Sequence, residues 1–122
     1  MVTHMSVLLN ICSPAEWEQA RRRGEHRPDS LREAGYVHLS TPQQVHLPAN
    51  RLYAGRTDLI LLHIDTSRLE APLHWEPGDA TDPAPMLFPH LYGPVPTSAV
   101  IAVTEYRPGG DGRFAPVQLS DA

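Results

Sequence analysis

Residues 57–65, TDLILLHID, most strongly constrain how this chain folds, because they are apolar almost without interruption. A run of this length fits a strand better than a helix. A strand without alternation of apolar and polar residues is typical of one that is buried on both faces. We therefore predict that residues 57–65 form the central strand of the sheet.

The segments on either side mix strand and helix patterns, without strict βαβ alternation late in the chain. A helix is predicted over 13–24, where Ser13 and Glu16 form a capping box and Gly24 ends the helix. A second helix is predicted over 41–55, where Pro48 should break or kink it in the middle. The remaining predictions are a helix at 27–35 and strands at 7–12, 36–40, 73–76, 86–91 and 98–107.

This mixture predicts an α+β fold. A length of 122 residues fits a single domain, 1–122. We expect its core at about 7–107, with residues 1–5 and 108–122 as tails or, at the C-terminal end, an edge strand.

Composition excludes several classes of function. No apolar run approaches the roughly 18 residues that a membrane span requires, and residues 1–11 do not resemble a signal peptide. We therefore expect a cytoplasmic protein, as a monomer or a small homo-oligomer. A net charge of −4 with scattered basic residues argues against duplex nucleic acid as a partner.

The stretch GYVHLST, residues 35–41, carries polar groups on one face of a short strand. A period of two sends Val37 and Leu39 to one face, and Tyr36, His38 and Ser40 to the other. An imidazole and a hydroxyl two residues apart project side by side and can together fix a sugar hydroxyl and an amide. Two plainer interpretations stay open: His38 bonds a neighbouring carbonyl, and Ser40 with Thr41 only caps the next helix.

The proline-rich and glycine-rich stretch over 71–96 is predicted to be an irregular connection that holds short strands. Long irregular segments in compact domains are often functional. Its FPHLYGPVP segment adds His90, Tyr92 and Gly93 to the candidate site residues. The same segment is also typical of a rigid turn. Glu76, before Pro77 and Gly78, is either a carboxylate of the site or a solvated one at a loop edge.

Seven histidines raise the question of a metal, since His38, His63, His74 and His90 could in principle converge. Their spacing matches no ligand pattern, and histidines in apolar runs are more often core residues with one hydrogen bond. We expect no metal, and keep a metal-dependent hydrolase of small molecules as a minor alternative. The single cysteine, Cys12, is more typical of a buried small side chain than of a nucleophile.

Four segments together resemble the small bacterial family catalogued as domain of unknown function 952. They are RPDSLREAGYVHLSTPQQV, LYAGRTDLILLHIDTSRL, LHWE and FPHLYGPVPTSAVIAV, and the resemblance extends from about Val7 to Arg107. The pairing of GYVHLST with FPHLYGP is the most specific part. Glutathione S-transferase-like names occur in this family, but no thiol-activating motif is present here.

The order of YVHLST, DLILLHIDTSRL and an aromatic-Gly-Pro segment also looks like that of RNA 2′-phosphotransferases. The resemblance implies an ADP-ribosyltransferase-like fold, with two small antiparallel or mixed sheets and short helices around a cleft for NAD. His38 and Ser40 match the pair that contacts the nicotinamide ribose and amide in that superfold. No E-x-E or Q-x-E turn is present, which leaves Glu76 and Glu105 as candidate carboxylates.

The predicted function is therefore binding of NAD or an ADP-ribose-like nucleotide, with NAD as substrate, and cleavage of the nicotinamide–ribose bond or transfer of ADP-ribose. The alternative is a binding or interaction domain on the same fold without catalysis. The candidate catalytic residues are His38, Glu76 and His90. The candidate ligand-binding residues are Tyr36, His38, Ser40, Thr41, Arg27, Arg51, Tyr92 and Gly93, and Arg56 is a further candidate for a diphosphate.

Overall fold

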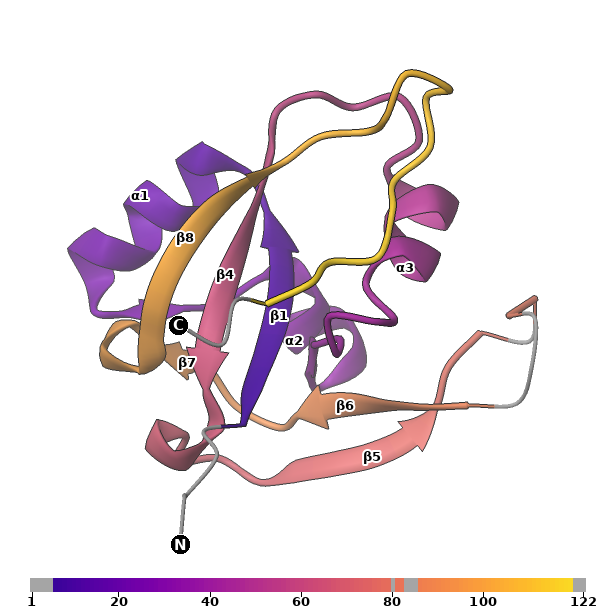
Figure 1. Ribbon diagram of the computed structural model, residues 1–122. Coiled ribbons are helices and arrows are strands. Elements are labelled where there is room, and N and C mark those ends of the chain that lie inside the picture. Colours follow the sequence, from indigo (N-terminus) through magenta and orange to yellow (C-terminus); the bar gives the residue numbers. More distant parts are fainter. Residues whose placement is uncertain (1–5, 80, 83–85, 120–122) are drawn as a thin grey trace, which may run out of the picture.

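The computed structural model describes residues 6–79, 81–82 and 86–119, and these form an α+β arrangement (Figure 1). The helices are α1 (Pro14–Arg23), α2 (Asp29–Ala34) and α3 (His46–Leu52). The strands are β1 (Val7–Cys12), β2 (Glu25–His26), β3 (Val37–His38), β4 (Leu59–Asp65), β5 (Leu73–Pro77), β6 (Leu87–Leu91), β7 (Val95–Pro96) and β8 (Val100–Tyr106). Within this part of the chain, no helix has the length and apolar character needed to cross a membrane.

The first sheet has the order β1-β4-β8, and both pairs are antiparallel. All seven residues of β4 are buried, and β4 lies between the other two strands, as the apolar run predicts. Alternate residues of β4 pack into different clusters, Leu62 into one and Leu61 into the other. The central strand therefore stabilises a core on each face of the sheet.

The second three-stranded sheet has the order β3-β6-β5, again with antiparallel pairs, and β2 pairs with β7. The strands predicted at 73–76 and 86–91 are both present. A bridge joins the two larger sheets, since Leu9 and Ser40 exchange backbone hydrogen bonds of 2.8 and 2.9 Å. Ser40 therefore lies where the two sheets meet.

The helices begin and end where local chemistry allows. At α1, the Ser13 side chain accepts from the Glu16 backbone, the Glu16 side chain accepts from Ser13, and Gly24 ends the helix with φ of 88°. The predicted break at Pro48 is wrong, because α3 begins only at His46 and Pro48 lies in its first turn. Proline is tolerated there, since the first backbone N–H groups of a helix have no partner within it.

The segment after β8 closes the second cluster. Phe114 is 3% exposed and packs with residues of β1, β4 and α3. Asn50 of α3 holds it, since its amide donates to the Phe114 carbonyl at 3.0 Å and accepts from the Phe114 backbone at 2.8 Å. We expected a tail or an edge strand over 108–122. The described residues of this segment form neither, because Phe114 is anchored and no strand is present there.

Candidate functional site

The register of β3 and β6 brings the polar residues of two distant segments together. Val37 is opposite Leu91, and His38 is opposite His90. Directly opposite residues share one face of a sheet, so the two imidazoles project to the same side. Val37, Leu39 and Leu91 are buried in the core on the other side, as the predicted alternation requires.

Aromatic and imidazole rings form a compact group on this polar face. Tyr36 stacks on His90, with ring centroids 4.0 Å apart and 13° between the planes. The His38 ring stands edge-on to both, at 4.9 Å from Tyr36 and 5.5 Å from His90. Tyr92 lies 5.3 Å from Tyr36. Ring contacts on several sides leave these side chains little freedom to rotate.

Glu76 of β5 fixes the orientation of this group. Its Oε1 accepts a hydrogen bond of 2.6 Å from the Tyr92 hydroxyl and one of 2.8 Å from Nδ1 of His90. Both hydrogen bonds lower the pKa of Glu76, and the bond from Tyr92 has the larger effect. In return, the Glu76 carboxylate raises the pKa of Tyr92 to about 12. A carboxylate only accepts, so Nδ1 of His90 carries the proton of this bond, and no described residue forms a hydrogen bond with its Nε2.

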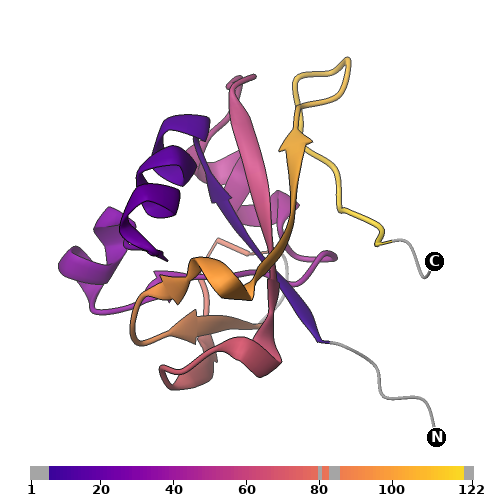
Figure 2. The same cartoon turned by 90° about the vertical axis from the view of Figure 1, so that its left-hand side faces the viewer.

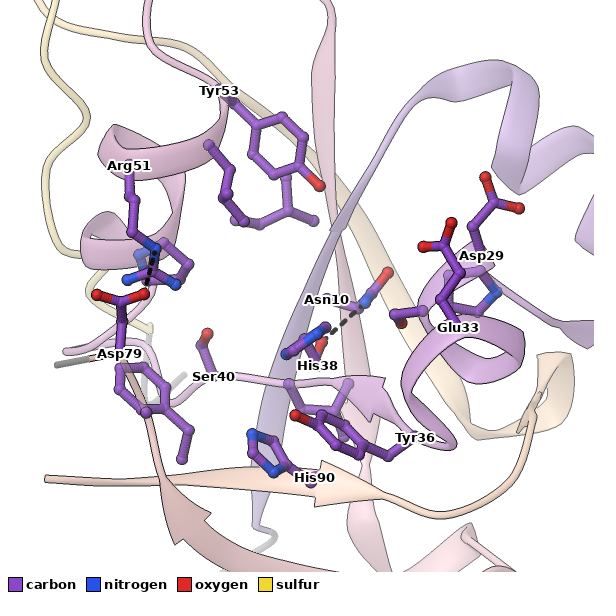
Figure 3. A pocket seen from close by; sticks show the side chains of 18 of the residues that line it. Asn10, Asp29, Glu33, Tyr36, His38, Ser40, Arg51, Tyr53, Asp79 and His90 are labelled. Carbon is purple, nitrogen blue, oxygen red and sulfur yellow. Dashed lines mark hydrogen bonds and ion pairs between the residues drawn. The ribbon is translucent and has the colours of Figure 1, made fainter.

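A cleft of about 520 Å³ lies beside this group (Figure 3). Tyr36, His38 and His90 contribute one wall, and Arg51 and Tyr53, in α3 and just after it, contribute another. Asp29 and Glu33 of α2 form the wall opposite Arg51 (Figure 3). The cleft is thus lined by residues from β1, β3, β6 and the helices.

His38 and Ser40 are two polar side chains that the cleft offers to a ligand. Burial lowers the pKa of His38, and the charges of His90 and Arg51 lower it further, so the ring is neutral at pH 7. Ser40 is 6% exposed, and its hydroxyl points into the cleft (Figure 3). Among the described residues, no hydrogen bond involves that hydroxyl.

Comparison with known proteins identifies the family. The family model described as "Protein of unknown function (DUF952)" matches residues 11–103. The chain belongs to this family. The resemblance of GYVHLST and FPHLYGP to domain of unknown function 952 is thereby confirmed, and the matched DUF952 region contains β3, β6 and the three helices that line the cleft.

Solved structures of the protein CC0527 from Caulobacter crescentus are similar to this DUF952 protein. The X-ray structure is 28% identical with a TM-score of 0.76, and the match covers 89% of this chain and 93% of that chain. The solution NMR structure is 30% identical with a TM-score of 0.72, covering 89% and 91%. No curated protein matches the chain.

The structure of this DUF952 protein brings together five of the residues that the sequence singles out. Tyr36, His38, Ser40, Arg51 and His90 all line the cleft. Glu76 and Tyr92 do not line the cleft, but Glu76 contacts His90 and Tyr92 contacts Tyr36. These seven form one connected site.

The other candidates lie elsewhere. The Thr41 hydroxyl accepts from the Gln44 backbone, so Thr41 rather than Ser40 caps the turn before α3. Arg27 pairs with Glu25 and lines a second, smaller cavity. Gly93 lies in the turn after β6, where a Cβ would meet that of Ala71 at 2.5 Å. Arg56 pairs with Asp58.

Sequence reasoning missed several residues that line the cleft. Asn10 of β1 is 5% exposed, donates to the His38 carbonyl and contacts Nε2 of His26, both at 3.0 Å. A polar residue on the buried face of VLLNIC is the signal that could have revealed it. Asp29 and Glu33, by contrast, look like ordinary exposed residues of a short amphipathic helix.

Three of the four histidines come together in the second sheet, where His90 is opposite His38 on one side and His74 on the other. The fourth, His63, does not join them. His63 bonds the Thr104 hydroxyl at 2.8 Å in the first sheet, away from the cleft. Among the described residues, no group of three His, Cys, Asp or Glu side chains is placed to hold a metal ion. Cys12 is buried, and burial raises its pKa to about 12, so it is not a thiolate at neutral pH.

Proposed function

We propose that the cleft binds NAD or an ADP-ribose-like nucleotide, and that its chemistry is cleavage of the nicotinamide–ribose bond or transfer of ADP-ribose. The observation that carries the proposal is the meeting of Tyr36, His38 and Ser40 with His90 in one cleft. Clefts of about 300–1,000 Å³ commonly hold small ligands and cofactors. The arrangement of two three-stranded sheets near the cleft supports our proposal of an ADP-ribosyltransferase-like fold.

Each lining group has a role in this proposal. The stacked rings of Tyr36 and His90 offer a flat surface for nicotinamide. His38 and Ser40 bind a ribose hydroxyl and the carboxamide. Arg51 contacts Asp79 at 3.7 Å and Asp82 at 3.4 Å, and it would exchange these long contacts for a diphosphate.

Hydrolysis on this site would need a base and a stabilising charge. Water adds to C1′ of the ribose as the C1′–N bond breaks, and the electron pair of that bond neutralises the nicotinamide ring. Nε2 of His90 is free to take the proton from water, because Glu76 holds Nδ1. Glu76 then acts through His90, and the carboxylates of α2 are the candidates that line the cleft itself.

The experiment is thermal unfolding of the wild type and His38→Ala with NAD, ADP-ribose or nicotinamide in excess. A ligand at a hundredfold its Kd adds about 2.7 kcal/mol to stability, which raises Tm by several degrees in a domain of this size. We expect NAD to stabilise the wild type and not His38→Ala. Arg113→Ala, at an exposed position that does not line the cleft, is the control and should keep the shift. No shift of the wild type with any of the three ligands overturns the proposal.

The hydrogen bonds of Glu76 favour a second candidate function, that of a nucleotide-binding domain without catalysis. Its carboxylate is occupied by Tyr92 and His90 rather than directed at the cleft. Release of nicotinamide from bound NAD, followed by chromatography, separates the two. Binding without release identifies the non-catalytic domain.

A further inference from the structure

The charges that line the cleft are unbalanced. Four carboxylates line it, Glu16, Asp29, Glu33 and Asp79, against a single guanidinium, Arg51. Arg51 lies within 4 Å of Asp79, so these two largely neutralise each other. The excess of negative charge is therefore on the wall formed by α2 and the start of α1.

The carboxylates differ in the hydrogen bonds and ion pairs that they already form within the protein. Glu16 accepts from the Ser13 backbone in the capping box, and Asp29 lies 3.6 Å from Arg32. Glu33 has no hydrogen bond or ion pair among the described residues, and it lines the cleft beside Asp29 (Figure 3). Glu33 is thus the carboxylate most available to a bound molecule.

Two further observations point to a ligand rather than to a solvated acidic face. The Ser40 residue is 6% exposed, and its hydroxyl points into the same cleft with no hydrogen bond among the described residues (Figure 3). The aromatic ring of Tyr36 also lines it. Aromatic faces attract cations, and the attraction grows as water is excluded.

We propose that the cleft selects a cationic heteroaromatic ring, such as the pyridinium of oxidised NAD, over a neutral ring of the same shape. The proposal rests on the nucleotide function above and adds the charge that the ligand must carry. It predicts that NAD binds more tightly than its reduced form, whose nicotinamide ring is neutral.

The test uses 1-methylnicotinamide, which is a cation, and nicotinamide, which is neutral, with binding to the full chain followed by NMR titration. Exposed ion pairs contribute little individually, so we expect a preference of about fivefold for the cation in the wild type. Glu33→Gln keeps the shape of the side chain and should reduce this preference about twofold. Glu18→Gln removes a carboxylate of α1 that does not line the cleft, and should leave the preference unchanged. High salt should weaken the preference, because ions screen exposed charges.

The outcomes separate this inference from the proposed function. Equal or undetectable binding of the two small molecules overturns the inference, as does a preference in Glu33→Gln that is as large as in the wild type. If NAD binds while the cation has no advantage, the nucleotide function stands and the charge selection fails. If the cation is preferred while no nucleotide binds, the nucleotide function fails and the cation site stands.

Discussion

Asn10 connects three strands through one side chain. The Asn10 amide faces the His38 carbonyl on one side. A carbonyl only accepts hydrogen bonds, so the amide atom on this side is Nδ2. Its oxygen therefore faces His26, and Nε2 of His26 carries the proton that completes the bond. A buried polar group with both of its partners present costs little, and here it joins β1 to the strand that carries His38.

Asn10→Ala removes both bonds and leaves the His38 carbonyl and the His26 Nε2–H group without partners. An unsatisfied buried group costs about 1–3 kcal/mol, and we expect the free energy of unfolding to fall by that amount. Denaturation in urea measures it. Gln118→Ala, at an exposed amide, is the control. A change for Asn10→Ala as small as that for the control would show that the side chain does not bridge the strands.

Among the elements, α1 has the most complete set of local signals. Ser13 and Glu16 satisfy each other's backbone groups, Pro14 occupies the first turn, and Arg21, Arg22 and Arg23 lie at the negative end of the helix dipole. α2, in contrast, has Pro28 at its N-cap and no side-chain cap. The helix that forms the acidic wall of the cleft therefore lacks the N-terminal stabilisation that α1 has.

Ser13→Ala removes the cap of α1 and should lower the free energy of unfolding by about 0.5–2 kcal/mol. Ser98→Ala, at an exposed serine whose hydroxyl has no partner among the described residues, should change it by no more than about 0.5 kcal/mol. Chemical denaturation of the two variants compares them directly. If Ser13→Ala were as stable as Ser98→Ala, the capping box would not contribute to stability.

Local patterns in the sequence predict elements but not their partners. Alternation around His38 correctly separates Val37 and Leu39 from the polar face, and apolar continuity identifies β4. The meeting of His38 with His90 depends on the register between strands 52 residues apart, which no local pattern contains. The helix predicted over 41–55 contains α3, but the predicted break at Pro48 was wrong, since a proline disrupts the middle of a helix and not its first turn.

At the scale of the whole molecule, histidines with lowered pKa values couple stability to pH. Burial lowers the pKa of His26, His38 and His63 from the ordinary value of 6.5. The folded state therefore takes up fewer protons than the unfolded state, and the fold loses stability as pH falls below about 6.5. Glu76, whose pKa is also lowered, adds a second loss of the same sign as pH falls below 4.5.

We therefore expect Tm to decrease from pH 7.5 to pH 5.5 and to decrease again below pH 4.5. Thermal unfolding followed by circular dichroism across this range measures both steps. His63→Gln should make the first step smaller, because it removes one of the three histidines whose pKa is lowered. Gln118→Ala, at an exposed position without a titratable group, should leave it unchanged. A Tm that rises on acidification through pH 6.5 would contradict the pKa directions of these histidines.

The order β1-β4-β8 also governs when the protein can complete its fold during synthesis. β1 and β4 can pair as soon as residue 65 has emerged from the ribosome, but the other edge of β4 waits for β8. Phe114, which covers the second cluster, emerges later still. Until then, one edge of β4, the most apolar strand, stays unpaired in the nascent chain. Unpaired edges of this kind promote aggregation and are bound by chaperones.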